Sequence, residues 1–202
     1  MKEKIKLILF GAGGHALSVI DVIESTNKFK ILFCLDNYEG TIGKYKVYKQ
    51  RKNLSYYKKF TNKVFISIGQ IKTAKIRMLL YKRLIKNKFI LPNIISPTAY
   101  VSKNSEIKNG TIVMHHVLIN SSCEIGENCI INSKSLIEHG VKIENNCHIA
   151  TGGIINGDCY IKKETFIGSN STIIQGKIVG SNSIIGSGKT LKKNLPSNST
   201  YK

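Results

Sequence analysis

Residues 135–153 read SLIEHGVKIENNCHIATGG, and within them Ile137, Ile143 and Ile149 lie six positions apart. The same step of six runs from Val101 to Leu191 without an insertion, and all sixteen positions that it meets are aliphatic. Composition alone does not produce so long an unbroken series. A strict period of six predicts a hexapeptide β-helix, in which short strands alternate with corners.

Two further columns keep the same period. The residue four places after each aliphatic position is usually small, at Ser105, Thr111, Cys123, Cys129, Ser135, Cys147, Gly153, Cys159, Thr165, Ser171 and Ser183. The residue three places after it is usually of a type that tolerates a left-handed backbone. This turn column holds Asn104, Gly110, Asn128, Gly140, Asn146, Gly152, Asp158, Asn170, Gly176, Asn182 and Gly188.

The three columns define a three-sided prism. The aliphatic side chains point inward, the small ones fit the corners, and the turn residues redirect the chain. Three hexapeptides complete a coil of 18 residues, so residues 18 apart stack, and successive coils are separated by the strand spacing of about 4.8 Å. Sixteen hexapeptides predict about five coils. Prisms of this kind wind left-handed, an exception to the right-handed crossover rule.

The cysteines follow from the same columns. Cys123, Cys129, Cys147 and Cys159 all occupy the small-residue column, and Cys34 lies in an apolar run outside the repeat. Free thiols packed as small hydrophobic groups explain this placement better than metal ligands do. We therefore expect no metal site.

A different domain precedes the repeat. Residues 6–23, KLILFGAGGHALSVIDVI, predict a buried strand at 7–10, a glycine turn and a helix from about residue 15, with further strands at 31–36 and 64–69 and a helix over 71–87. Gly11, Gly13, Ala16 and Asp36 fit the dinucleotide-binding fingerprint. Only about 90 residues are present, enough for half of a Rossmann fold. We expect an α/β domain over residues 1–90 and a left-handed parallel β-helix over 91–202.

The formal charge of +19 falls mainly on residues 1–100, which carry 20 Lys/Arg against 5 Asp/Glu. The lysines are scattered and no aromatic platform lies among them, so we expect no nucleic-acid partner. An affinity for anionic ligands fits the charge better. No apolar run approaches the length of a membrane span, and we expect a cytoplasmic protein.

His139 is the strongest candidate for a catalytic group. It follows an inward aliphatic residue by two positions and therefore projects outward, stacked between Ser121 and Gly157, with Glu138 beside it. An exposed imidazole that titrates near neutral pH can act as a general base. The alternative is a solvated surface histidine without a function.

Four stretches resemble a known enzyme family: INSKSLIEHG (131–140), NGD (156–158), ETFIGS (164–169) and IIGSG (184–188). With the preceding GAGGH turn, the chain resembles the bacterial sialic acid O-acetyltransferases and the related nucleotide-amino-sugar N-acetyltransferases over nearly its whole length. These stretches favour the sialic acid branch. The resemblance implies acetyl-CoA as co-substrate, and homotrimers whose active sites lie between neighbouring prisms.

The resemblance also implies roles for particular residues. His139 would be the general base with Glu138 beside it, and Asn132 an active-site amide. Contacts to acetyl-CoA would come from His148, Ser169 and Ser187. Residues matching the substrate-nucleotide pocket are Gly13, Gly14, His15, Asp36, Asn37 and Gly69.

One position departs from the family pattern. The N-acetyltransferases place an acidic residue directly after the catalytic histidine, where it orients the ring, and here that residue is Gly140. Glu138 is the alternative source of an orienting carboxylate.

Four functions remain open at this level. The first is O-acetylation of a sialic acid or a related sugar, and the second is N-acetylation of a nucleotide-linked amino sugar. The third is a non-catalytic partner of a sialic acid pathway enzyme, which the glycine at 140 keeps open. The fourth, a nucleotide-dependent oxidoreductase, is disfavoured by the short first domain.

Overall fold

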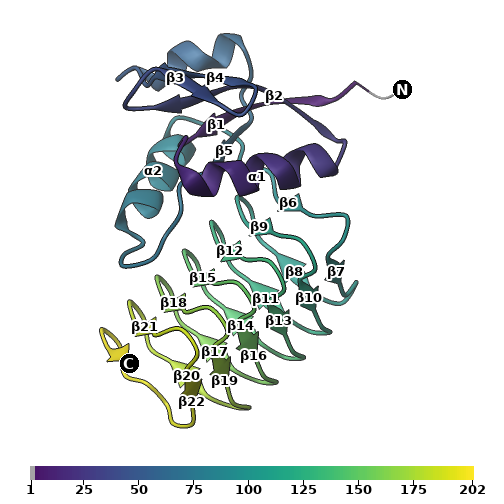
Figure 1. The fold of residues 1–202 in the computed structure, drawn as a ribbon, viewed down its shortest axis with the longest axis vertical. Coiled ribbons are helices and arrows are strands. Elements are labelled where there is room, and N and C mark those ends of the chain that lie inside the picture. The colour runs from purple at the N-terminus through teal and green to yellow at the C-terminus, as the bar shows by residue number, and fades with distance from the viewer. Residues whose placement is uncertain (1–2) are drawn as a thin grey trace. The chain divides into compact units, whose positions relative to one another are not determined.

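The computed structural model describes residues 3–202, which form two compact units (Figure 1). The first unit contains the described residues up to Gly69 together with Ile76–Pro92. The second contains Asn93–Lys202 and, in addition, the short segment Gln70–Lys75. The expected division near residue 90 did not anticipate that segment 70–75 packs with the later part of the chain.

A five-stranded sheet in the order β3-β4-β2-β1-β5 forms the centre of the first unit. Strand β1 pairs in parallel with β2 and β5, β2 pairs in parallel with β4, and the hairpin β3–β4 is antiparallel. The elements are β1 (Ile5–Phe10), α1 (Gly14–Ser25), β2 (Phe29–Asp36), β3 (Gly40–Ile42), β4 (Tyr45–Lys49), the 3-10 helix η1 (Leu54–Lys59), β5 (Val64–Ile66) and α2 (Lys75–Lys86).

The glycine turn between β1 and α1 has a steric cause. Gly11 has φ +111°, and a Cβ there would lie 2.9 Å from the backbone nitrogen of Ile68. Only glycine fits so close an approach. The predicted order of strand, turn, helix and strand is confirmed, although the hairpin β3–β4 was not anticipated. The predicted third strand is also too long, since β5 ends at Ile66.

The second unit is a parallel β-helix whose coils stack one upon another (Figure 1). Its eighteen two-residue strands form three sheets and about six coils. Sheet I contains β7 (Tyr100–Val101), β10 (Leu118–Ile119), β13 (Leu136–Ile137), β16 (Ile154–Ile155), β19 (Thr172–Ile173) and β22 (Thr190–Leu191). Sheet II contains β8 (Glu106–Ile107), β11 (Glu124–Ile125), β14 (Lys142–Ile143), β17 (Tyr160–Ile161) and β20 (Ile178–Val179). Sheet III contains β6 (Ile94–Ile95), β9 (Ile112–Val113), β12 (Ile130–Ile131), β15 (His148–Ile149), β18 (Phe166–Ile167), β21 (Ile184–Ile185) and β23 (Thr200–Tyr201).

The predicted register of 18 residues is confirmed. Ile137 pairs with Ile155 on sheet I, and Ile131 pairs with Ile149 on sheet III. Every residue of the aliphatic column packs in one core, all of them buried except the partly buried Val101 and Ile107. Strands β6 and β23 extend the prism beyond the sixteen repeats, which explains why the structure has more than the five coils expected.

The turn column also has the predicted conformation. Positive φ angles recur every six residues from Gly110 to Gly188, including Asp158 at +57° and Gly140 at +68°, whereas Asn104 does not share them. Three turn residues are of types less suited to this backbone, namely Ser122, Lys134 and Glu164. The repeat therefore imposes the turn even where the side chain does not favour it.

All five cysteines are free and buried. The thiols of the small-residue column donate to backbone carbonyls of the next coil, as Cys147 does to Lys162 over 3.2 Å. Burial raises the pKa of the Cys147 thiol well above its usual value and that of Cys34 to about 11. These are inert packing groups, as the column predicted.

Shortening a core side chain should destabilise the prism. Ile155 is fully buried in the aliphatic column, whereas Ile178 is 40% exposed. Because Ile155→Ala leaves a cavity, we expect it to lower the free energy of unfolding by about 2–5 kcal/mol. The surface control Ile178→Ala should change it by no more than about 0.5 kcal/mol. Urea denaturation measures both, and equal losses would contradict the inward orientation of the column.

Candidate active site

His139 lies in the turn between β13 and β14, at the corner where sheet I meets sheet II. Its side chain is 56% exposed, so the ring points outward as predicted. The corner backbone is held by the coils on either side: the Gly140 N–H donates to the Ser121 carbonyl, and the Asp158 N–H donates to the His139 carbonyl, each over 3.0 Å. These backbone hydrogen bonds between neighbouring coils therefore fix the point from which the His139 side chain projects.

The space beside the ring depends on Gly157, in the following coil. A Cβ on Gly157 would lie 2.6 Å from Cε1 of His139 and 2.7 Å from Nε2. Any larger residue at 157 would displace the ring. The prediction that a small neighbour flanks His139 is confirmed at this position.

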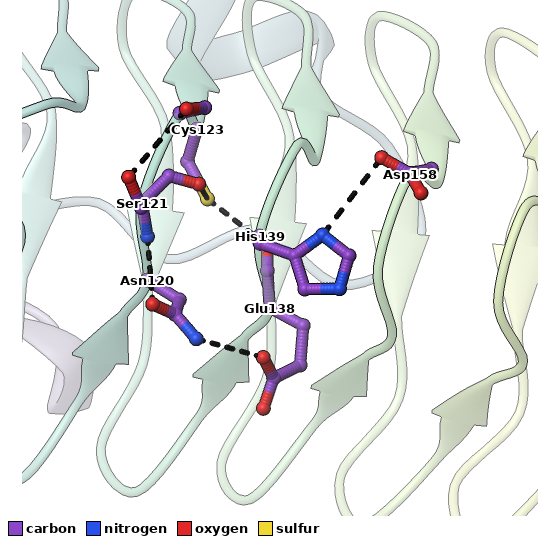
Figure 2. A network of polar contacts seen from close by, with 7 residues as sticks. Asn120, Ser121, Cys123, Glu138, His139 and Asp158 are labelled. Carbon is purple, nitrogen blue, oxygen red and sulfur yellow. Dashed lines mark hydrogen bonds and ion pairs between the residues drawn. The ribbon is translucent and has the colours of Figure 1, made fainter.

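Two carboxylates lie near His139, and their side chains point in different directions (Figure 2). Glu138 is its neighbour in sequence, and Asp158 lies in the next coil. Glu138 turns away from the ring, and its Oε2 accepts a hydrogen bond from Nδ2 of Asn120 over 2.9 Å. Asp158 instead approaches the ring, with Oδ1 at 3.9 Å from Nδ1 of His139. Sequence reasoning placed Asp158 in the turn column and in the stretch NGD at 156–158, and it missed this approach to the ring. The sequence signal that could have revealed the approach is the spacing: Asp158 follows Gly140 by 18 residues and therefore stacks on it in the next coil.

His148 and Asn132 form a second group, on sheet III and the corner that follows it. Nδ1 of His148 lies 2.5 Å from the carbonyl oxygen of Gln70, which can only accept, so Nδ1 carries a proton. Nε2 then accepts from Nδ2 of Asn132 over 3.3 Å. The imidazole is 6% exposed and packs edge to face against Phe166, with ring centroids 5.2 Å apart. His148 thus points outward from the prism, but segment 70–75 covers it.

Ser169 and Ser187 lie on that same corner, between sheet III and sheet I. The carbonyl of Ser169 accepts from the N–H of Gly188 over 2.8 Å, which stacks the two serine turns in successive coils. Asn132 begins the equivalent turn two coils earlier. Two of the three residues expected to contact coenzyme, Ser169 and Ser187, therefore share one corner of the prism with the expected active-site amide Asn132. The third, His148, is buried in sheet III beside that corner, and His139 lies on a different corner of the same chain.

The expected nucleotide residues lie in the first unit. Asp36, at the end of β2, accepts backbone N–H groups at both carboxylate oxygens, from Ala12 over 2.6 Å and from Asn37 over 2.7 Å. Asp36 and Asn37 also line a cavity of about 300 Å³ at the ends of β1 and β2, together with Lys49. A cavity at the carboxyl ends of parallel strands is the usual ligand position in α/β folds.

The other expected residues surround the start of α1. Gly13 and Gly14 begin the helix, and a Cβ on either would meet open space, so the first N–H groups of the helix are not crowded. Gly69 lies against His15, since its Cβ would be 3.3 Å from that of His15. A helix N-terminus with accessible N–H groups suits an anionic ligand.

Within residues 3–202, no group of three or more His, Cys, Asp or Glu side chains is arranged to hold a metal ion. No helix in the same range has the length and apolar character needed to cross a bilayer.

Two family descriptions match the chain. The PglD N-terminal domain matches residues 6–84, and the hexapeptide repeat of succinyl-transferase matches residues 123–156 and 161–193.

Solved structures resemble both units. GDP-perosamine N-acetyltransferase from Caulobacter crescentus, solved with CoA and GDP-perosamine, is 25% identical, with 96% of this chain and 92% of that chain covered and a TM-score of 0.89. The acetyltransferase domain of PglB from Neisseria gonorrhoeae, solved with acetyl coenzyme A, is 23% identical over 98% and 96%, with a TM-score of 0.89. WeeI from Acinetobacter baumannii is 22% identical over 98% and 96%, with a TM-score of 0.82.

The fold and these matches define the chain as a left-handed β-helix acyltransferase of the hexapeptide class. It carries a match to the PglD N-terminal domain ahead of the repeat, and over both units it is similar to acetyl-CoA-dependent sugar acetyltransferases.

The contacts of Asp36 predict a stability role. Asp36→Ala leaves the Ala12 and Asn37 N–H groups without their carboxylate, so we expect unfolding to require about 1–3 kcal/mol less free energy. Glu39→Ala, which removes an exposed carboxylate three residues away, is the control and should have little effect. Urea denaturation monitored by circular dichroism compares them. Indistinguishable stabilities would show that the carboxylate does not hold the glycine turn.

Proposed function

We propose that the protein transfers an acetyl group from acetyl-CoA to the amino group of a nucleotide-linked sugar. The observation that carries this proposal is the similarity of both units, over 96% of the chain, to a GDP-perosamine N-acetyltransferase solved with CoA and its nucleotide sugar. The cavity beside Asp36 and the helix N-terminus at Gly13 supply places for a nucleotide in the first unit.

The exposed imidazole provides the chemistry. Acetyl-CoA supplies an activated acetyl thioester. As the acceptor nitrogen attacks the thioester carbonyl, a C–N bond forms and the C–S bond breaks, and His139 takes the proton that the nitrogen loses. Because Nδ1 faces Asp158, Nε2 is the nitrogen positioned to receive it. The proton then returns to the departing thiolate of CoA.

The arrangement of the corners favours a homotrimer with shared sites. His139 lies between sheets I and II, whereas Asn132, Ser169 and Ser187 lie between sheets III and I. One prism therefore does not bring the base together with Ser169 and Ser187, two of the expected coenzyme contacts, or with the expected active-site amide Asn132. A neighbouring prism, related by a threefold axis, would place its coenzyme corner beside the His139 of its partner.

O-acetylation of a sialic acid or related sugar is the second candidate. The specific observation in its favour is the set of stretches at 131–140, 156–158, 164–169 and 184–188. A hydroxyl acceptor would use the same base and the same coenzyme. A non-catalytic role is less well supported, because the objection from Gly140 loses weight when Asp158 supplies a carboxylate beside the ring.

Replacing the base should abolish acetyl transfer. We expect His139→Asn to lower kcat about 10²–10⁴-fold, since that is the usual contribution of a general base. Release of CoA thiol measures the rate, with UDP- and GDP-linked amino sugars and free or CMP-linked sialic acids as acceptors. The control is Glu164→Gln, which changes a turn residue at the corner between sheets II and III, away from both the base and the expected coenzyme contacts Ser169 and Ser187.

The acceptor panel separates the candidates. Turnover with amino sugars alone supports N-acetylation, and turnover with sialic acids alone replaces it by the second candidate. Absence of turnover with every acceptor would favour a non-catalytic partner. Full activity in His139→Asn would contradict the proposed role of His139 as the base.

Subunit mixing tests the shared site. We expect light scattering to give a mass of about three chains of 22.5 kDa each. His139→Asn and Asn132→Ala should each be impaired alone. Co-refolding the two in equal amounts should restore roughly a quarter of the sites, because each site takes its base from one chain and its coenzyme corner from another. A monomer, or mixing without recovery, would contradict the arrangement.

A further inference from the structure

We propose that Asp158 is the positioning residue of His139, a carboxylate supplied by the next coil of the prism in place of one from the neighbouring position in sequence. This inference rests on the proposed function, since it assigns a partner to the base used there. It is carried by the approach of Asp158 to the ring and by two glycines that make the approach possible.

The Asp158 carboxylate faces Nδ1 of His139, the ring nitrogen that takes no proton from the acceptor in the proposed reaction. Oδ1 of Asp158 lies 3.9 Å from Nδ1 of His139, and both side chains are more than half exposed (Figure 2). Glu138, the other carboxylate at this corner, is held by Asn120. Asp158 therefore attracts a proton on Nδ1 and leaves Nε2 with the lone pair that a base requires.

Two glycines clear the space for this approach. A Cβ on Gly140 would collide with Oδ1 of Asp158, and a Cβ on Gly157 would collide with the His139 ring. Gly140 also has φ +68°, so a side chain there would be strained in any case. The absence of a side chain at Gly140 thus leaves the space that the Asp158 carboxylate of the next coil occupies.

The backbone fixes where Asp158 begins. Its N–H donates to the carbonyl of His139 over 3.0 Å, and its φ of +57° belongs to the turn column. The two residues are therefore locked in neighbouring coils by the same ladder. Only side-chain rotation remains to set the separation of the two groups.

The separation is that of an ion pair and exceeds a hydrogen bond. The attraction is consequently greatest once the ring has accepted a proton and become an imidazolium. An interaction that strengthens as the reaction proceeds lowers the barrier, and it leaves substrate binding almost unchanged. Asp158 should therefore influence kcat far more than KM.

The test compares Asp158→Asn with Glu164→Gln. Asparagine accepts the same left-handed turn, so the fold should be retained, and Glu164 is a turn-column carboxylate of the following hexapeptide with φ +63°. We expect Asp158→Asn to lower kcat roughly three- to tenfold, the range of a partly exposed ion pair, with KM for both substrates unchanged. Glu164→Gln should match wild type. The Asp158 effect should diminish in high salt, because salt screens exposed charges.

A second readout does not depend on turnover. ¹⁵N–¹H spectra of the imidazole report which nitrogen carries the proton, and Asp158→Asn should reduce the share of the Nδ1–H form of His139. Unchanged kcat and unchanged tautomers in Asp158→Asn would overturn the inference, while loss of activity in His139→Asn would still uphold the proposed function. Equal losses in Asp158→Asn and Glu164→Gln would also overturn it, because they would indicate a general effect on the turns. Full activity in His139→Asn would overturn both this inference and the assignment of His139 as the base.

Discussion

The stacking of residues 18 apart is the constraint on which the rest of the second unit depends. Parallel hydrogen bonds join each coil to the next, and the inward aliphatic column keeps the coils in phase, as the pairing of Ile137 with Ile155 shows. A shift of one residue would turn the buried column outward. Because the register between coils is fixed, the neighbours of each outward residue are fixed as well. This register is what places His139 beside Gly157 and Asp158.

The periodicity of the prism could be predicted because each column has a single physical requirement. Inward positions must be aliphatic and turn positions must accept a positive φ, so Ile155 and Gly140 could be placed from their spacing alone. The direction of a long side chain has no such requirement. Glu138 could face either the ring or Asn120, and only the packed neighbours decide between them. The approach of Asp158 depends on this same kind of choice and was missed.

Other features were missed because they depend on tertiary contacts. Segment 70–75 has no periodicity of its own, and it joins the second unit through the hydrogen bonds of Gln70 to Asn146 and His148. The hairpin of β3 and β4 is short and mostly polar, which leaves little pattern to detect. The glycine turn at Gly11, by contrast, was predicted, since steric exclusion of a Cβ is visible in the residue type itself.

The hydrogen bonds of His148 have a consequence for molecular recognition at the corner beside it. Since the Gln70 carbonyl and the Asn132 amide occupy its two ring nitrogens, this imidazole cannot offer a ligand either a proton or a lone pair without breaking a bond. The Oδ1 of Asn132 is likewise engaged, by the Ser133 N–H over 2.8 Å. These bonds leave the second amide hydrogen of Asn132 unused. A ligand at this corner would thus meet the Asn132 amide as a hydrogen-bond donor. The buried His148 ring would orient that amide without contacting the ligand.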